Sequence, residues 1–160
     1  MPRHEGAGQP LSDFSLTPET LNDSMSTLFT SSVFRCLEVS PTHVLAEQKI
    51  DQNGLRPGGF VPGPVQFSLA DLVLWYLTSA AINRIEPMAL TSDLSIRFLR
   101  PGQGEMLYAR ADLDKAGRLM IIGTVKIWVD DREEKPISVA QGTYVSVSYT
   151  HLTLPTKVTV

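Results

Sequence analysis

The longest run of apolar residues in the chain lies between Gly63 and Arg84 and contains few polar positions. The run is too long for a strand, and Pro64 suits the first turn of a helix, so the pattern predicts a helix that begins at Gly63. A helix that is apolar on nearly all sides must be enclosed by protein or lipid. Asp71 interrupts the run, and a carboxylate at bilayer depth costs at least about 2.5 kcal/mol. The pattern therefore favours a helix buried in protein over a membrane span.

Two shorter patterns precede this helix. Thr17 and Pro18 are typical of a helix start, and the apolar residues that follow predict a short surface helix with one inward stripe. The inward positions are Leu21, Met25, Leu28 and Phe29. Two β-prone runs within 33–50, divided by a Ser-Pro turn, predict a hairpin. Asn-Gly and Pro-Gly-Gly within 51–62 predict a loop that leads into the long helix.

Four segments of alternating apolar and polar residues follow the long helix, which we expect to close at Glu86 and Pro87. The strands are expected at 89–99, 105–114, 118–129 and 136–147. Turn sequences between them predict hairpins, and hence an antiparallel meander. One buried helix followed by such a meander is an α+β arrangement.

Length and composition fit one domain. The chain has 160 residues, of which 42% are hydrophobic, and this is enough for a conventional core. We expect a flexible lead over residues 1–16, the domain over 17–147, and a tail over 148–160 that is not part of the domain. Residues 1–25 contain no apolar signal core, which predicts a cytoplasmic protein.

Charge and ligand residues argue against several classes of function. The formal net charge of −3 disfavours a protein that grips nucleic acid. Cys36 is the single cysteine, and the three histidines lie far apart in sequence, so neither a disulfide nor a metal site is expected. Asp71 is the residue that calls for explanation, because a buried carboxylate normally pairs, titrates or opens onto a cavity. A pair with Arg97, Arg100 or a backbone amide would make its role purely structural.

The order of these elements, with Leu-Ala-Asp at 69–71 in the helix and Phe-Leu-Arg-Pro-Gly at 98–102, resembles the PaaI-like acyl-CoA thioesterases of the hotdog fold. The resemblance covers roughly residues 30–147. It implies an antiparallel sheet wrapped around one long central helix, and protomers that pair so that two sheets join. It also implies hydrolysis of an acyl-CoA thioester to a carboxylic acid and free CoA, with no cofactor other than the CoA of the substrate.

The family motif at the helix start is His-Gly-Gly followed by Leu-x-Asp, and here Pro62, Gly63 and Pro64 stand in place of His-Gly-Gly. The resemblance gives Gly63 a backbone N–H that polarises the thioester carbonyl, and Asp71 the role of nucleophile or general base. Thr91 aligns with a small hydroxyl residue that supports the attacking water in some members. Because Pro64 has no N–H, an oxyanion hole would rest on Gly63 and the loop before it.

Other residues near these positions are expected to contact the substrate. Either Asn53 or Arg56 takes the place of the polar residue that precedes the family motif, and the choice between them stays open. Helical spacing places side chains three and four positions from Asp71 on one wall, which could meet an acyl or aryl group. The full set of substrate-binding candidates is Asn53, Arg56, Gly59, Pro62, Phe67, Ser68, Trp75 and Arg100.

Gly63 and Asp71 are eight positions apart, which is roughly 12 Å along a helix axis. One helix therefore cannot bring both to the same carbonyl. If both act, Gly63 comes from one protomer and Asp71 from its neighbour, with the two helices antiparallel about a two-fold axis. We expect a homodimer that could pair further into a dimer of dimers, with acyl-CoA as its small-molecule partner.

Two other functions stay open. A non-catalytic protein that binds acyl-CoA or an aromatic ligand would keep the pocket without the chemistry, since the family His is missing and Pro64 has no N–H. The hydratase branch of the same fold has a helix start that resembles Pro-Gly-Pro-Val at 62–65. That branch needs a His in the preceding loop and an acid at the position of Phe67, and this chain has neither.

Overall fold

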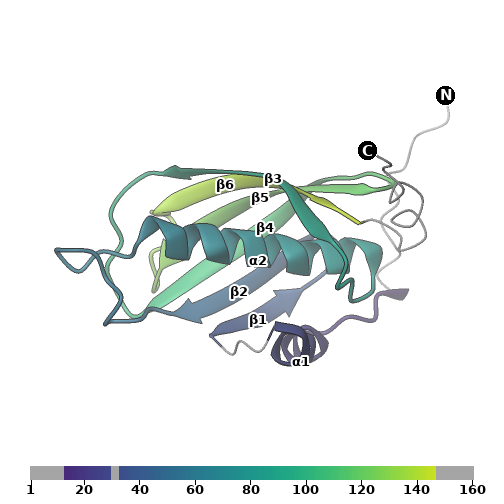
Figure 1. The fold of residues 1–160 in the computed structure, drawn as a ribbon, viewed down its shortest axis with the longest axis horizontal. Coiled ribbons are helices and arrows are strands. Elements are labelled where there is room, and N and C mark those ends of the chain that lie inside the picture. Colours follow the sequence, from purple (N-terminus) through teal and green to yellow (C-terminus); the bar gives the residue numbers. More distant parts are fainter. Residues whose placement is uncertain (1–12, 30–32, 147–160) are drawn as a thin grey trace, which may run out of the picture.

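The computed structural model describes residues 13–29 and 33–146, which form one curved six-stranded sheet and two helices (Figure 1). The helices are α1 (Pro18–Phe29) and α2 (Gly63–Ile82). The strands are β1 (Phe34–Val39), β2 (His43–Lys49), β3 (Leu90–Phe98), β4 (Met106–Ala116), β5 (Met120–Val129) and β6 (Ser138–Val145). The predicted α+β class is confirmed, with an antiparallel sheet wrapped around one central helix and a short helix before it.

α2 lies against the concave face of the sheet, and every residue from Val73 to Ala80 is buried. Two glycines paired across β5 and β6, Gly123 and Gly142, face this helix. A Cβ at Gly142 would lie 2.5 Å from a methyl group of Leu74. The missing side chains therefore allow α2 to lie close to the sheet. Of the helices in the described residues, α2 alone is long and apolar enough to span a bilayer, and here it is the core helix.

α2 ends at Asn83, which adopts the left-handed backbone conformation (φ 56°, ψ 40°). The N–H groups of Asn83 and Arg84 donate to carbonyls of the last helical turn. Asparagine tolerates this conformation better than most residues, so it can stop a helix as glycine does. The predicted end at Glu86 and Pro87 is wrong, because the helix stops before either residue.

The strand order is β1-β2-β4-β5-β6-β3, and every neighbouring pair is antiparallel. β3 thus pairs with β6 and not with β4. The predicted hairpin at Pro101 and Gly102 is wrong, since residues 99–105 carry the chain past β6 and β5 to β4. The alternation of a strand shows which face is buried but does not identify its partner. β3 consequently forms one edge of the sheet, beside α2.

α1 covers the opposite edge, next to β1 (Figure 1). Thr17 caps the helix as predicted, with its hydroxyl accepting a backbone N–H of the first turn at 3.2 Å. Leu21 and Met25 face inward and are buried. Leu28 was expected on the same stripe but is 44% exposed, so the inward stripe is shorter than predicted. The side chain of Phe29 lies outside the described residues.

The predicted lead and tail lie mostly outside the described residues. Asn83 binds the first described residues, which precede α1. The Asn83 side chain accepts from the Ser15 N–H at 3.0 Å and donates to the Asp13 carbonyl at 2.8 Å. This segment is therefore tied to the C-terminal end of α2.

Candidate functional site

Asp71 lies on the side of α2 that faces β3 and β6. Its Oδ1 atom accepts a hydrogen bond from the Thr91 hydroxyl at 2.6 Å and another from the Tyr144 hydroxyl at 2.8 Å. The Asp71 Oδ2 atom accepts no hydrogen bond from the residues that the structure describes. The predicted structural alternatives, a pair with Arg97, Arg100 or a backbone amide, do not form within the described residues. Two neutral hydroxyl groups therefore orient the carboxylate and leave one oxygen available.

A cavity of about 300 Å³ opens beside this carboxylate. Asp71, Thr91 and Tyr144 form its polar wall, together with Ser68. The rest of the lining is apolar and comes from Met25, Phe34, Leu72, Trp75, Ala89 and Leu90. An apolar hollow with a few convergent polar groups is the usual form of a small-molecule site.

Gly63 lies at the N-terminal end of α2, before Asp71. It is the first residue of the helix, where N–H groups lack an acceptor within the helix. A Cβ at Gly63 would lie 3.1 Å from the ring of Phe98, so Gly63 is beside the last residue of β3. Because α2 is unbroken from Gly63 to Asp71, the two are separated by roughly 12 Å along its axis. One protomer does not place both at one carbonyl.

The remaining predicted site residues lie either in the Asp71 cavity or near the Gly63 end of α2. Ser68 and Trp75 line the Asp71 cavity. Asn53, Arg56 and Gly59 lie in the loop before α2 and do not line it. The Asn53 N–H donates to Asp51, Arg56 forms an isolated bridge with Phe60, and Gly59 has a left-handed φ of 82°. The choice between Asn53 and Arg56 as a site residue stays open.

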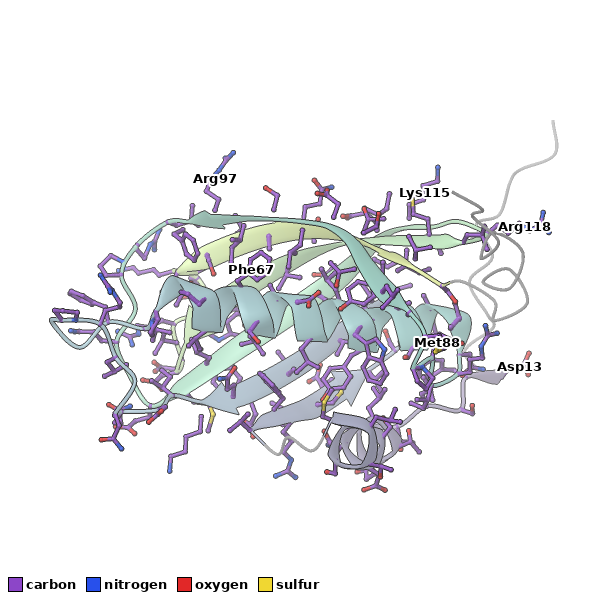
Figure 2. The ribbon with its side chains drawn as sticks, in the orientation of Figure 1. Asp13, Phe67, Met88, Arg97, Lys115 and Arg118 are labelled. Atoms are coloured by element: carbon purple, nitrogen blue, oxygen red, sulfur yellow. The ribbon has the colours of Figure 1, made fainter. Side chains whose placement is uncertain are left out.

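Three further candidates lie toward the start of α2. Pro62 precedes the first helical residue with an extended backbone (φ −64°, ψ 148°). Phe67 lies on α2 itself, and its side chain is 43% exposed (Figure 2). Arg100 lines a separate hollow of about 110 Å³ that also contains Arg132 and Lys135. None of these three residues lines the Asp71 cavity.

Sequence reasoning missed Tyr144. The residue is 5% exposed, and burial raises the pKa of its phenol above the ordinary value, with the neighbouring Asp71 charge adding to the effect. The phenol is therefore a neutral donor to the carboxylate. The signal in the sequence was the alternation of β6, which places Tyr144 on the same inward face as Ala140 and Gly142.

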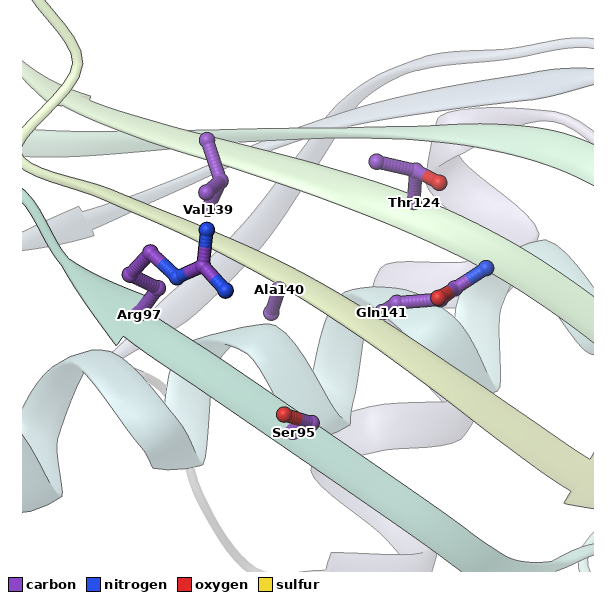
Figure 3. Close-up of a pocket in the computed structure, with 6 residues that line it drawn as sticks. All are labelled: Ser95, Arg97, Thr124, Val139, Ala140 and Gln141. Atoms are coloured by element: carbon purple, nitrogen blue, oxygen red, sulfur yellow. The ribbon is translucent and has the colours of Figure 1, made fainter.

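A second hollow, of about 280 Å³, lies on the outer face of the sheet, over β3, β5 and β6 (Figure 3). Its lining comes from Ser95, Arg97, Thr124, Val139, Ala140 and Gln141. Figure 2 shows Arg97 pointing away from α2. The hollow is open and contains no carboxylate, and no predicted site residue lines it.

Comparison with known proteins agrees with this fold. The sequence model of the thioesterase superfamily matches residues 58–135, a range that contains Gly63, Asp71 and Thr91. No curated protein sequence matches the chain.

Several solved structures are similar over most of the chain. Zebrafish thioesterase superfamily member 2 is 22% identical, with a TM-score of 0.72 over 83% of this chain and 100% of that chain. A candidate thioesterase from Silicibacter sp. TM1040 is 26% identical, with a TM-score of 0.74 over 87% and 95% of the two chains. A thioesterase from Haemophilus influenzae is 22% identical, with a TM-score of 0.71 over 84% and 92%. Residues 58–135 are therefore similar to the thioesterase superfamily, and the fold of the chain is the hotdog fold of these solved structures.

Proposed function

We propose that the chain is an acyl-CoA thioesterase in which Asp71 acts as general base or nucleophile. The observation that carries this proposal is the Asp71 carboxylate, held at one oxygen by Thr91 and Tyr144 and open to a largely apolar cavity. The superfamily match makes thioester hydrolysis the expected chemistry. The apolar lining suits the acyl or aryl part of a substrate, with the carboxylate at the reacting end.

Hydrolysis requires activation of water or direct attack on the carbonyl carbon. As a base, Asp71 takes a proton from water while the water oxygen attacks the carbonyl carbon. As a nucleophile, Asp71 forms an anhydride with the acyl group, which water then cleaves. In both routes the C–S bond breaks and the CoA thiolate leaves and takes up a proton. The Gly63 N–H, at a helix N-terminus, stabilises the negative charge that develops on the carbonyl oxygen.

We propose that the two parts of this site meet across a two-fold axis, with Gly63 from one protomer and Asp71 from its partner. The roughly 12 Å between them along α2 supports this arrangement. Large apolar side chains of α2 and β3 are exposed: Phe67, Leu90 and Phe98 are 43%, 63% and 52% exposed. β3 also leaves one edge without a strand among the described residues. A second copy placed on this edge would cover these side chains.

A binding protein without turnover is the second candidate. Pro62 replaces the family His, and Pro64 removes one N–H from the helix start, so the oxyanion hole has fewer donors. The hydratase branch fits less well, because Phe67 stands where that branch has an acid.

The experiment is thioester cleavage by the purified protein with short, medium, long and phenylacetyl CoA substrates, with the free thiol measured. Asp71→Asn should lower kcat by about 10³-fold, because the amide cannot accept a proton or attack. Asp112→Asn, an exposed carboxylate on the outer face of β4, is the matched control and should keep activity.

Light scattering measures the oligomeric state in parallel. The proposal is supported if the protein is a dimer and if its turnover is lost in Asp71→Asn. Binding of CoA esters without turnover would favour the binding protein, and turnover by a strict monomer would contradict the shared site.

A further inference from the structure

We infer that Tyr144 is a positioning residue of this site: together with Thr91 it fixes Oδ1 of Asp71 and so directs Oδ2 toward the thioester. The inference rests on the proposed function, to which it adds a residue and an assignment of the reacting oxygen.

The hydrogen bonds of Tyr144 carry the inference. Its hydroxyl lies 2.8 Å from Asp71 Oδ1 and 2.9 Å from the Asp71 main-chain carbonyl oxygen. One phenol therefore contacts both the side chain and the backbone of the same residue. With the Thr91 hydroxyl at 2.6 Å from Oδ1, that oxygen has two donors, while Oδ2 has none among residues 13–29 and 33–146. Donors reduce the electron density available for reaction, so Oδ2 is the more basic and nucleophilic oxygen.

The strand register explains why the two hydroxyls converge. Thr91 on β3 is paired directly with Tyr144 on β6, so both side chains project from the same face of the sheet, toward α2. A bulge between Thr91 and Asp93 follows immediately. Bulges re-aim neighbouring side chains and are common beside active sites. Three elements, α2, β3 and β6, thus meet at one carboxylate oxygen.

The two donors are not equivalent. Thr91 is exposed and lies on the edge strand, whereas Tyr144 is 5% exposed and lies on β6, which pairs with a strand on each side. Because its ring is buried, the Tyr144 side chain is held in place more tightly than that of Thr91. Burial raises the pKa of its phenol, which keeps the proton that it donates. A neutral donor orients the carboxylate without the neutralising effect of a cation.

Tyr144→Phe tests the inference, since it removes the hydroxyl and keeps the ring. We expect kcat to fall about tenfold or more, with KM nearly unchanged, because a hydrogen bond to a charged group is lost at the reacting carboxylate. Tyr76→Phe is the matched control: this tyrosine is fully buried in α2, and its hydroxyl has no hydrogen-bond partner among the described residues. It should keep both constants. Unchanged kcat in Tyr144→Phe, or a rise in KM alone, would overturn the positioning role.

Crystal structures of both variants give a second readout that does not depend on turnover. In Tyr144→Phe the Asp71 carboxylate should rotate or occupy two positions, and in Tyr76→Phe it should remain in place. An Asp71 side chain that stays fixed in Tyr144→Phe would contradict the inference. If the wild-type protein cleaves no thioester, the proposed function fails, and the two crystal structures still decide whether Tyr144 holds Asp71.

Discussion

The hydroxyl of Thr91 lies 2.6 Å from Oδ1 of Asp71, which links the edge strand β3 to the central helix α2. Thr91→Val should lower kcat about tenfold or more, because a hydrogen bond to a charged group is worth about 1.5–3 kcal/mol. Thr91→Ser keeps the hydroxyl and should keep most of the activity. Steady-state kinetics of the two variants check this, and a fully active Thr91→Val would show that the contact does not serve the reaction.

The N–H of Gly63 can be removed by a proline substitution. Gly63→Pro places proline at the first helical position, which proline tolerates, and the ψ of 148° at Pro62 suits a following proline. We expect kcat to fall about 10²–10³-fold, the usual cost of one oxyanion donor. Gly63→Ala is the matched control, since it adds a Cβ near Phe98 and keeps the N–H. Equal losses in both variants would assign the effect to crowding.

Asn22 on α1 stabilises the edge strand β1. Its side chain donates to the Cys36 carbonyl at 3.1 Å and accepts from the Cys36 N–H at 2.7 Å, so it satisfies backbone groups of an open edge. Asn22→Ala should lower the free energy of unfolding by about 2 kcal/mol. Ser26→Ala on the same helix removes only a bond to a carbonyl of α1 and should change stability little. Urea unfolding compares the two, and similar losses would contradict the role of Asn22.

Cys36 should be unreactive in the folded protein. Burial raises the pKa of its thiol from 9.0 to about 12, and the thiolate is the reactive form. Iodoacetamide at pH 8 should therefore modify Cys36 only as the protein unfolds, and fast modification would contradict the burial.

The same shift makes stability depend on pH. Because the folded pKa lies above the unfolded one, the stabilising contribution of the Cys36 thiol is complete below about pH 9 and is lost as the pH rises toward 12. Between these values the free energy of unfolding should fall more steeply for the wild type than for Cys36→Ala. Parallel slopes for the two proteins would contradict this prediction.

Local pattern was enough to predict most of the fold. The apolar run after Gly63, the cap at Thr17 and the alternation of the later strands each depend on neighbouring residues, and these elements lie where they were expected. The end of α2 was misplaced, because the left-handed conformation of Asn83 depends on its contacts and not only on residue type. The partner of β3 was also missed, since strand pairing is decided by the whole sheet.

The site was predictable only in part. Family resemblance pointed to Asp71 and Thr91, and the structure brings these two into contact. Tyr144 lies 73 positions from Asp71, and the contact depends on β6 pairing with β3 rather than on any spacing in the sequence. Because the predicted strand order did not pair β6 with β3, it could not show that Tyr144 contacts Asp71.

The pairing of β3 with β6 also sets the order in which the nascent chain can fold. Phe98 and Ser138 are the paired positions closest in sequence, and they are 40 residues apart (138 minus 98). During synthesis α2 and β3 leave the ribosome before β6 does, so β3 has no partner strand while β4 and β5 form. Pairs this distant form late, after local hairpins. The carboxylate on α2 therefore gains the Tyr144 hydroxyl only after β6 pairs with β3, and a chain cut before β6 would keep Thr91 but lack Tyr144.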